Sequence, residues 1–451
     1  MSKVYNSALQ ARVTQFLQDK QEGVRPAVCN PGCRGQGELE PGLFHSRGHN
    51  RGCTGMRKRR EQFSDRLARL FPPKQLSGSE KDMARTVTFA VTDACSLRCS
   101  YCYQRVKSHH AMSFETAKKF TDLLLRGDNP YINPDNSPGV IIEFIGGEPL
   151  LEIDLIDRIT DYFISEMIRL RHPWATRFML SICSNGTEYF NPGVQAYLKK
   201  HMSHLSFGIS IDGCKQLHDA CRVFPDGRGS YDIAIAGVKH FTEVLGGKMG
   251  SKMTLAPQNV GYTFQAIQNL IALGYGEINL NCIYEEGWTV EHAQTLYQQL
   301  KQTADFLIEN RLEDIYLSIF EEDFFRPKAP DDLQNWCGGT GDMISVDYTG
   351  NIYPCIRYMP NSLGPGIKPL TIGHVDHGIL GTQAERDCAH CLKCIDRRTQ
   401  STDECFNCPI AEGCSWCSAY NYQVFGTADQ RATFICVMHK ARALANAYYW
   451  N

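Results

Sequence analysis

The chain has 451 residues, 43% of them hydrophobic and 21% charged, which is an ordinary globular balance with apolar material enough for two or three domains. Its 47 basic and 49 acidic residues leave a net charge of -2, which argues against a dedicated nucleic-acid-binding protein. The sequence has no apolar run of membrane-spanning length, and its first residues lack the apolar core of a secretory signal, so we expect a cytoplasmic protein with no membrane partner.

The twenty cysteines depart from that ordinary balance. Ten of them fall at or after Cys337, many at spacings of two or three residues. A reducing cytosol keeps thiols free, so clustered cysteines in such a chain indicate metal binding or catalysis more often than disulfides. We therefore predict a metal protein.

The first two of three predicted parts are residues 1–82 and 83–325. The first combines helical patterns over residues 8–20 and 56–71 with a loop rich in glycine and cysteine. In the second, six apolar runs predict buried strands at 86–92, 140–147, 177–186, 204–213, 251–257 and 277–283. Helical patterns lie between and after them at 113–125, 155–170, 194–201, 233–245, 264–273 and 291–309. Apolar strands that alternate with helices are typical of a parallel sheet covered by helices, or of a barrel of βα units.

The third predicted part is residues 326–451. A last apolar run occupies residues 314–319, and from about residue 327 the periodicity fades while cysteine, glycine and short turns dominate. This texture is expected of a domain ordered around metal rather than around a large apolar core. Two other cysteines, Cys183 and Cys282, fall within apolar strands and are predicted as core thiols.

A cysteine loop directly follows the first predicted strand. Cys95, Cys99 and Cys102 have the spacing C-x3-C-x2-C, with the aromatic Tyr101 just before the third cysteine. Three thiolates on one tight loop can hold three irons of a 4Fe–4S cluster and leave the fourth iron open for a bidentate small molecule, whereas a closed structural site supplies four ligands. A zinc loop is the alternative.

This loop resembles that of the radical S-adenosylmethionine (SAM) enzymes, and four later segments match the motifs of that family in order. They lie at the predicted strand ends, on the rim where barrel enzymes place their chemistry. The segments are Gly146-Gly147-Glu148-Pro149, Ser184-Asn185-Gly186, Ser210-Ile211-Asp212-Gly213, and His218-Asp219 followed by Arg222. The resemblance implies an α/β fold, a partial (β/α)6 TIM-type barrel.

The resemblance also implies a cofactor and its binding residues. They are Gly146, Gly147 and Glu148 for the amino group of SAM, Ser184, Asn185, Ser210 and Asp212 for its ribose and methionine parts, and Arg222 for its carboxylate. One electron from the cluster would cleave SAM, and the resulting 5′-deoxyadenosyl radical would take a hydrogen atom from the substrate.

The C-terminal cysteines resemble the SPASM extension of a subset of these enzymes, in which seven cysteines hold two auxiliary 4Fe–4S clusters. By that resemblance the first auxiliary cluster takes Cys337, Cys355 and Cys417, and the second takes Cys405, Cys408, Cys414 and Cys436. A cluster that links distant cysteines would close large loops and order a segment with little core.

Two features depart from the SPASM pattern. Only two residues separate Cys417 from the cysteine before it, where the family has three. An additional triplet lies outside the seven: Cys388, Cys391 and Cys394. We predict that one of the triplet is the fourth ligand of the first auxiliary cluster, with a further metal site or free thiols as alternatives. A zinc ribbon that pairs Cys391 and Cys394 with the C-x2-C at 405–408 also stays open.

The resemblance is strongest to maturases of ribosomally made peptides, particularly those that form thioether or other crosslinks. It implies a precursor peptide as substrate and a reductant such as flavodoxin or ferredoxin. The alternative enzyme is an anaerobic sulfatase maturase, which oxidises a protein Cys or Ser; that family has a proton-accepting aspartate where this chain has Ile356. A non-catalytic iron–sulfur electron carrier or scaffold is the alternative from another class.

Overall fold

The computed structural model describes residues 84–126, 129–246, 249–312, 314–321 and 337–450. The predicted segment 1–82, with its two helical patterns, lies outside these residues. Within the described ranges, no helix combines the length and the apolar character that crossing a bilayer requires.

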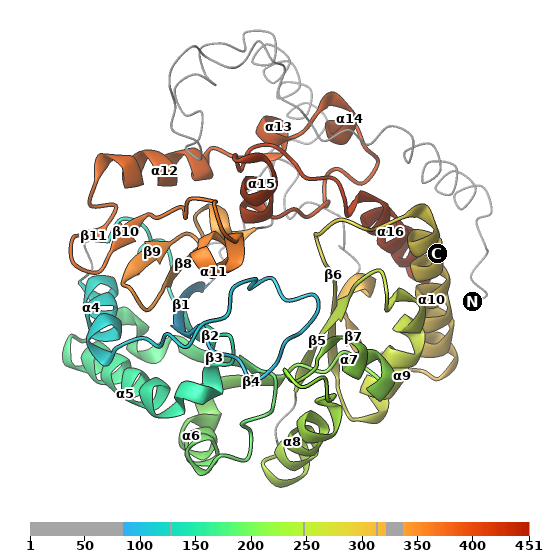
Figure 1. Ribbon diagram of the computed structural model, residues 1–451, viewed down its shortest axis with the longest axis horizontal. Coiled ribbons are helices and arrows are strands. Elements are labelled where there is room, and N and C mark those ends of the chain that lie inside the picture. The colour runs from blue at the N-terminus through green and yellow to red at the C-terminus, as the bar shows by residue number, and fades with distance from the viewer. Residues whose placement is uncertain (1–83, 127–128, 247–248, 313, 322–336, 451) are drawn as a thin grey trace.

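The first part of the described chain alternates strands and helices, as the sequence predicts (Figure 1). The strands are β1 (Arg85–Thr92), β2 (Val140–Gly146), β3 (Phe178–Ser184), β4 (Leu205–Ile209), β5 (Gly250–Leu255), β6 (Glu277–Cys282) and β7 (Tyr316–Leu317). The helices are α4 (Phe114–Leu125), α5 (Ile153–Arg169), α6 (Pro192–His201), α7 (Lys215–Cys221), α8 (Tyr231–Val244), α9 (Thr263–Ala272) and α10 (Val290–Glu309). The longer helices lie outside the strands, which confirms the predicted barrel-like α/β architecture.

Local sequence explains where these elements begin and what they bury. Helix α4 begins after Ser113, whose side chain accepts a hydrogen bond from the backbone N–H of Thr116. Strand β1 is buried on both faces over most of its length, because helices cover the sheet on one side and the interior of the partial barrel is filled on the other. The ring of Phe89 on β1 packs against Phe120 of α4 and Phe144 of β2.

The strands form two hydrogen-bonded sheets. One has the order β11-β10-β9-β8-β1-β2-β3-β4 and the other β5-β6-β7, and β1 to β4 are mutually parallel, as are β5 to β7. The ladder is interrupted between β4 and β5, where the hydroxyl of Ser251 donates to the carbonyl oxygen of Ile211 at 3.0 Å. The carboxyl ends of β1 to β4 therefore share one rim.

The C-terminal part contributes strands to the same sheet and several helices above it. The strands are β8 (Met343–Val346), β9 (Asn351–Tyr353), β10 (Gly373–His374) and β11 (Gly378–Ile379). The helices are α11 (Pro360–Leu363), α12 (Gln383–Lys393), α13 (Arg397–Gln400), α14 (Asp403–Phe406), α15 (Ser418–Phe425) and α16 (Cys436–Trp450). Strand β8 pairs in parallel with β1, from Thr86 opposite Met343 to Phe89 opposite Val346, so the sheet continues across the predicted boundary at residue 325.

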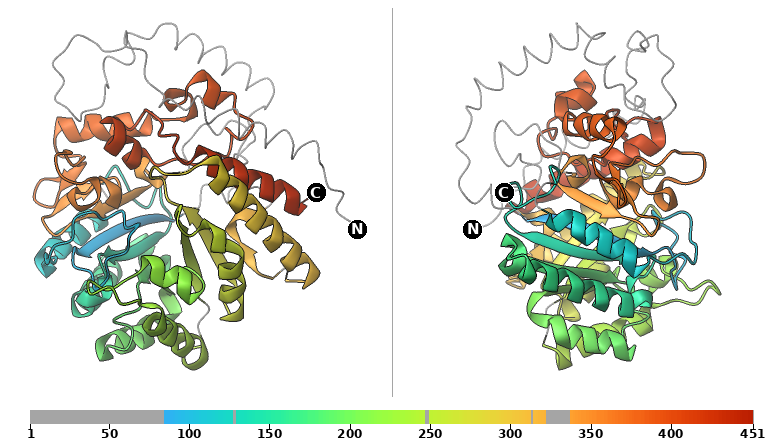
Figure 2. Two further views of the ribbon diagram at one scale, coloured as in Figure 1. Left: turned by 45° about the vertical axis from the view of Figure 1, so that its right-hand side comes forward. Right: turned by 90° about the vertical axis from the view of Figure 1, so that its left-hand side faces the viewer.

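The C-terminal part contacts both edges of the partial barrel. At one edge β8 extends β1; at the other, α16 lies along α10, as Figure 2 shows. The amide of Asn446 donates to the carbonyl oxygens of Ile319 and Glu321 at 2.8 and 2.7 Å, and the hydroxyl of Tyr448 donates to Asp305 at 2.7 Å. The C-terminal residues therefore contact β1 at one edge of the partial barrel and α10 at the other, and so link the two edges.

Candidate active site and cysteine groups

The loop after β1 brings Cys95, Cys99 and Cys102 close to one another, and we call them the first cysteine group. Cys102 lies near enough to raise the pKa of Cys95 and of Cys99 electrostatically, and Cys95 also raises the pKa of Cys99. Burial is the larger effect and raises the pKa of Cys99 to about 11. The ammonium of Lys107 donates to Cys102 Sγ at 3.4 Å. Because metal ligands must be thiolates, binding of a metal would displace protons from these thiols.

The start of this loop lies directly against the end of β2. The backbone N–H groups of Gly147 and Glu148 donate to the carbonyl oxygens of Thr92 and Ala94 at 2.9 and 2.8 Å. A Cβ on Gly147 would lie 2.2 Å from the carbonyl oxygen of Ala94 and 2.8 Å from Cys95 Cβ. The predicted GGEP segment therefore needs this glycine so that the cysteine loop can approach the strand.

Glu148 joins the ends of β2 and β3. Its carboxylate accepts hydrogen bonds from the Ser184 hydroxyl and the Asn185 backbone N–H, both at 2.7 Å, and from the Leu150 backbone N–H at 3.1 Å. Burial raises the pKa of Glu148 to about 7, although these three donors act in the opposite direction. Glu148, which is predicted to bind the SAM amino group, therefore also holds the ends of β2 and β3 together.

The remaining predicted residues of β3 and β4 also lie at this rim. The amide of Asn185 donates to the Ser96 hydroxyl at 3.0 Å and lies 3.7 Å from Cys95 Sγ. The backbone N–H of Ser210 donates to the carbonyl oxygen of Ser184 at 2.8 Å, and its hydroxyl lies 3.4 Å from the half-buried Cys183. Cys282, the other predicted core thiol, is buried as expected.

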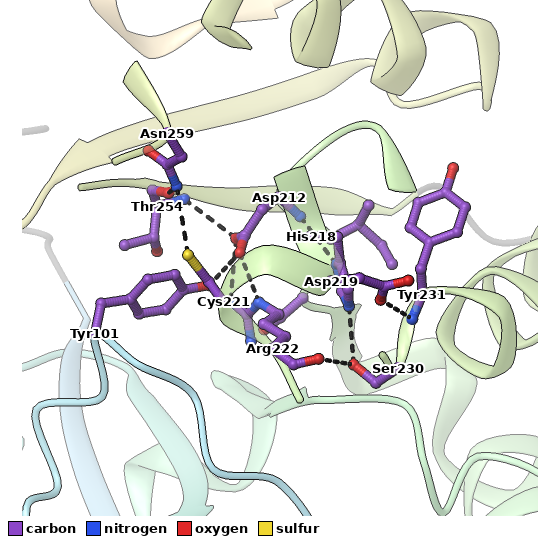
Figure 3. A network of polar contacts seen from close by, with 12 residues as sticks. Tyr101, Asp212, His218, Asp219, Cys221, Arg222, Ser230, Tyr231, Thr254 and Asn259 are labelled. Atoms are coloured by element: carbon purple, nitrogen blue, oxygen red, sulfur yellow. Dashed lines mark hydrogen bonds and ion pairs between the residues drawn. The ribbon is translucent and has the colours of Figure 1, made fainter. Parts of the chain in front are cut away.

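Asp212 and Arg222 form a buried ion pair beside the first cysteine group (Figure 3). Arg222 Nε and Nη2 donate to Asp212 Oδ2 and Oδ1 at 2.9 and 3.2 Å. The hydroxyl of Tyr101 also donates to Asp212, and the guanidinium carbon lies 5.4 Å from the centre of the Tyr101 ring. The backbone N–H of Thr254 completes the set at 3.3 Å. Arg222, which is predicted to bind the SAM carboxylate, is therefore already oriented by the carboxylate of Asp212.

His218 links the backbones of Asp212 and Arg222, the two residues of this ion pair. Its Nδ1 accepts from the backbone N–H of Asp212 at 3.5 Å, which leaves the Nε2 hydrogen for the Ser230 hydroxyl at 3.0 Å. That hydroxyl donates to the carbonyl oxygen of Arg222 at 2.9 Å. Burial lowers the pKa of His218 to about 4, with the charge of Arg222 acting in the same direction, so the imidazole is neutral at physiological pH.

The three-cysteine group consists of Cys337, Cys355 and Cys417, which the structure brings together from three separate segments. A Cβ added to Gly339 would lie 3.2 Å from Cys355 Sγ and 3.4 Å from Cys337 Sγ. A hydrogen bond from Cys417 lowers the pKa of Cys337 to about 6 and raises that of Cys417. The grouping is the one that the SPASM resemblance implies.

The four-cysteine group consists of Cys405, Cys408, Cys414 and Cys436, which line one pocket together with Arg431 and His439. Burial raises the pKa of Cys414 to about 11, and the Arg431 guanidinium beside it opposes that rise. Arg431 Nη2 lies 2.7 Å from Cys414 Sγ. These four sulfurs again match the set implied by the resemblance.

The additional triplet lies at α12 and its end. Cys388 is buried, Cys391 half-buried and Cys394 exposed, with Cys394 Sγ 3.7 Å from His390 Nε2. Tetrahedral zinc, with Zn–S bonds of about 2.3 Å, needs sulfurs about 4 Å apart. Among the described residues, the one group of three or more donors within 4.8 Å is Asp157, Asp161 and His201, so no such cysteine set has zinc spacing.

Several residues around these groups were missed from the sequence. They are Thr254 and Ser230 near Arg222, Arg431 at the four-cysteine group, and the pair Arg357–Glu285, whose Nη2 and Oε1 lie 2.7 Å apart. Tyr101 was noted only as an aromatic. A lone arginine or hydroxyl carries no spacing signal, and only the tertiary fold brings these residues next to Arg222 and the cysteine groups.

Comparison with curated proteins finds relatives of modest similarity, while no protein-family model matches the chain. An uncharacterised protein of Methanocaldococcus jannaschii is 28% identical over 275 residues, 61% of this chain and 85% of that protein. The Fe-coproporphyrin III synthase of Methanosarcina barkeri is 27% identical over 42% of this chain and 41% of its own length. The serine-type anaerobic sulfatase-maturating enzyme of Bacteroides thetaiotaomicron is 27% identical over 32% and 33%.

Two solved structures have a similar fold over most of the chain. Native anSMEcpe with bound AdoMet is 16% identical and superposes with a TM-score of 0.62 over 81% of this chain and 98% of that one. Streptococcus suis SuiB bound to precursor peptide SuiA is 11% identical, with a TM-score of 0.53 over 95% and 88%. At these identities the likeness establishes the fold.

The radical SAM cyclopropyl synthase TigE of Paramaledivibacter caminithermalis is 21% identical over 74% of this chain and 67% of its own length. The fold, the cysteine loop at the strand rim and these relatives are therefore those of a protein similar to radical SAM enzymes, in agreement with the resemblance predicted from the sequence. The cofactors of that class, SAM and 4Fe–4S clusters, fit the residues present. The first group offers three thiols beside a buried arginine, and two further groups offer three and four thiols.

Proposed function

We propose that this enzyme modifies a ribosomally made precursor peptide through radical SAM chemistry. The observation that carries the proposal is the convergence of the first cysteine group, Glu148 and Arg222 at one rim of the sheet, which β8 connects to the C-terminal cysteine groups. A peptide substrate is supported by the structures of anSMEcpe with bound AdoMet and Kp18Cys peptide and of SuiB with precursor peptide SuiA. A flavodoxin or ferredoxin would supply the electron.

In this proposal each group of residues has one task. Cys95, Cys99 and Cys102 hold the cluster that binds SAM, and Arg222 takes the SAM carboxylate through the guanidinium donor that Asp212 does not engage. The first auxiliary cluster takes Cys337, Cys355 and Cys417 with one of Cys388, Cys391 and Cys394; the second takes Cys405, Cys408, Cys414 and Cys436. Bound SAM supplies the hydrogen-abstracting radical; the chain orients the reactants and excludes water.

The proposed modification is a crosslink, in particular a cysteine thioether. Such a bond oxidises the peptide by two electrons, one lost with the abstracted hydrogen and one passed to an acceptor after sulfur attack. The product should be lighter by about two mass units per crosslink, one pair of hydrogens, and its crosslinked thiols should resist iodoacetamide. A product that loses hydrogen but keeps every thiol alkylatable would carry a carbon–carbon or carbon–oxygen bond instead.

Iron content and SAM cleavage test the enzyme class directly. Anaerobically reconstituted protein should bind about twelve irons, as three four-iron clusters, and should convert SAM to 5′-deoxyadenosine when reduced. The Cys95→Ala/Cys99→Ala/Cys102→Ala variant should keep about eight irons and lose cleavage. Undiminished 5′-deoxyadenosine formation by that variant would overturn the proposal.

A second candidate function is oxidation of a protein Cys or Ser, as in sulfatase maturases. The partial similarity to the Bacteroides thetaiotaomicron enzyme favours it. Ile356 disfavours it, because an aliphatic side chain stands where that family has a proton-accepting aspartate. Incubation with a Cys- or Ser-containing sulfatase peptide separates the two, since only the second function yields an aldehyde that reacts with a hydrazide probe.

A further inference from the structure

Each C-terminal cysteine group lies beside a buried arginine, and the charge of the buried Lys440 also acts on Cys436 of the four-cysteine group. Arg357, two residues after Cys355, packs between the rings of Tyr103 and Tyr420, with its guanidinium carbon 5.5 and 5.6 Å from the ring centres. The backbone N–H of Tyr420 donates to Cys417 Sγ at 3.4 Å, which places the cation next to the three-cysteine group. Arg431 contacts the four-cysteine group directly through Cys414 Sγ at 2.7 Å.

The two arginines differ in what balances their charge. Arg357 Nη2 donates to Glu285 Oε1 at 2.7 Å, so a carboxylate neutralises this cation locally. Within the described part of the chain, Arg431 pairs with no carboxylate; its other contacts are the carbonyl oxygens of Cys414 and Ser415 at 3.1 and 3.2 Å. Only 6% of Arg431 is exposed to solvent.

A buried guanidinium keeps its proton, so its charge must be balanced by nearby negative charge. At Arg431 that negative charge can come from the sulfurs of the four-cysteine group. The one-electron reduction of a 4Fe–4S cluster adds one negative charge to the buried site, and a neighbouring cation stabilises the reduced form. A cation already paired with a carboxylate stabilises it less.

We propose that Arg357 and Arg431 give the two auxiliary clusters different reduction potentials, and that the four-cysteine cluster is the easier of the two to reduce. The inference rests on the proposed function, which supplies the clusters. Its consequence is a direction for internal electron transfer: one electron on the three-cysteine cluster moves to the four-cysteine cluster, which oxidises the first and reduces the second. Both arginines act indirectly, because their charges set the reduction potentials of the clusters.

A redox titration of the reconstituted full-length protein tests this order. The Cys95→Ala/Cys99→Ala/Cys102→Ala background removes the first cluster, so that two couples remain to be followed by electron paramagnetic resonance as dithionite is added. Arg357→Gln should lower the potential of one couple, and Glu285→Gln should raise the potential of the same couple. Arg431→Gln should lower the potential of the other couple, which should be the higher one in the parent protein.

The opposite shifts expected for Arg357→Gln and Glu285→Gln separate an electrostatic role from a structural one. Loss of packing at this ion pair would shift the potential in the same direction for both variants. Arg357→Lys and Arg431→Lys keep the charge and should stay near the parent potentials. Arg228→Gln, at an exposed arginine paired with Asp226, serves as the control that leaves both couples unchanged.

Three outcomes would overturn the inference: shifts of the same sign for Arg357→Gln and Glu285→Gln, no shift in either, or an Arg431-sensitive couple that is the lower one. Failure of this inference is distinguishable from failure of the proposed function. If the proposed function were wrong, the parent protein would take up no iron at the C-terminal cysteines, or the wild-type chain would not cleave SAM.

Discussion

Glu148, Asp212 and Arg222 are held by partners from neighbouring strands before any cofactor arrives. The Glu148 carboxylate has three donors, and the Arg222 guanidinium is fixed by two hydrogen bonds to Asp212. Groups that are fixed in advance lose little entropy when a ligand binds, so such a rim favours one orientation of the cofactor.

We expect Arg222→Ala to weaken SAM binding. Loss of a charge-assisted hydrogen bond to the SAM carboxylate costs about 1.5–3 kcal/mol, which is about tenfold to a hundredfold in affinity. Anaerobic equilibrium dialysis of reconstituted protein measures this loss. Arg228→Ala, at an exposed arginine seven residues from Cys221, is the matched control and should leave the affinity unchanged.

The Arg222 variant also leaves Asp212 buried without its cation, which destabilises the fold. Arg222→Lys is therefore needed beside it, because it keeps the charge and loses only the two-pronged geometry. If both variants fold and bind SAM as tightly as the wild type, Arg222 does not take the SAM carboxylate.

His218 should make the stability of the protein depend on pH. Its pKa falls from 6.5 to about 4 on folding, because burial disfavours the charged imidazole. Between these values the unfolded chain binds a proton that the folded chain does not, so stability rises with pH and is lost as the pH falls. Unfolding by urea should therefore show about 1 kcal/mol less stability from this group at about pH 5.5 than at about pH 7.5.

The His218→Gln variant provides the comparison for that measurement. Glutamine can still donate to the Ser230 hydroxyl but does not titrate, so the difference in unfolding free energy between the two pH values should shrink. An unchanged difference would mean that another group carries the pH dependence.

At the scale of elements, the two glycines that end β2 determine how closely the cysteine loop approaches. We expect Gly147→Ala to reduce iron uptake by the first cysteine group, because its Cβ would meet the Ala94 carbonyl oxygen at 2.2 Å and push the loop away. Iron analysis should give about eight irons per chain rather than about twelve. Gly261→Ala is the control, since its Cβ would meet nothing within 4 Å, and full iron occupancy of Gly147→Ala would contradict the role of the close approach.

The sequence predicts the barrel elements well because their apolar periodicity is strong. Helix α5, for example, begins at Ile153 and ends at Arg169, within two residues of the prediction, and it buries one apolar stripe. Helix α16 was missed, since it buries Lys440, Arg442 and Asn446 together with its apolar residues and so lacks an amphipathic pattern. Helix α7 was missed because it has only seven residues.

The same contrast holds for the candidate site. Spacing alone predicts the cysteine loop, because its three thiols are close in sequence. The ties of Glu148 to the end of β3, and the pairing of Arg357 with Glu285, depend on which strands become neighbours and leave no local signal. The grouping of Cys417 with Cys337 and Cys355 comes from family resemblance, since Cys417 lies 62 positions after Cys355.

At the scale of the whole molecule, the C-terminal residues complete the barrel as well as carrying cysteines. We expect a chain cut after residue 325 to be insoluble, because β1 would lose its neighbour β8 and α10 would lose α16. An uncovered sheet edge and an uncovered apolar helix face both favour aggregation. Expression of residues 83–325 with size-exclusion chromatography tests this expectation.

A soluble, monomeric fragment that takes up about four irons would instead support residues 83–325 as an independent domain. The Asn446→Ala variant of the full chain is a milder test of the same contact. It leaves the carbonyl oxygens of Ile319 and Glu321 without their donor, and thermal unfolding should reveal a loss of about 1–3 kcal/mol.

The position of Cys436 links metal binding to the order of biosynthesis. This residue is the first of α16 and lines the four-cysteine pocket, so the pocket is joined directly to the helix that lies along α10. Cys417 of the three-cysteine group lies between Cys414 and Cys436 in sequence. Neither C-terminal group is complete until the ribosome has passed residues 417 and 436, and the nascent barrel meanwhile keeps the α10 face uncovered. If these groups bind clusters as proposed, the clusters can be completed only late in synthesis, and we expect chains made without iron to hold α16 less firmly against α10.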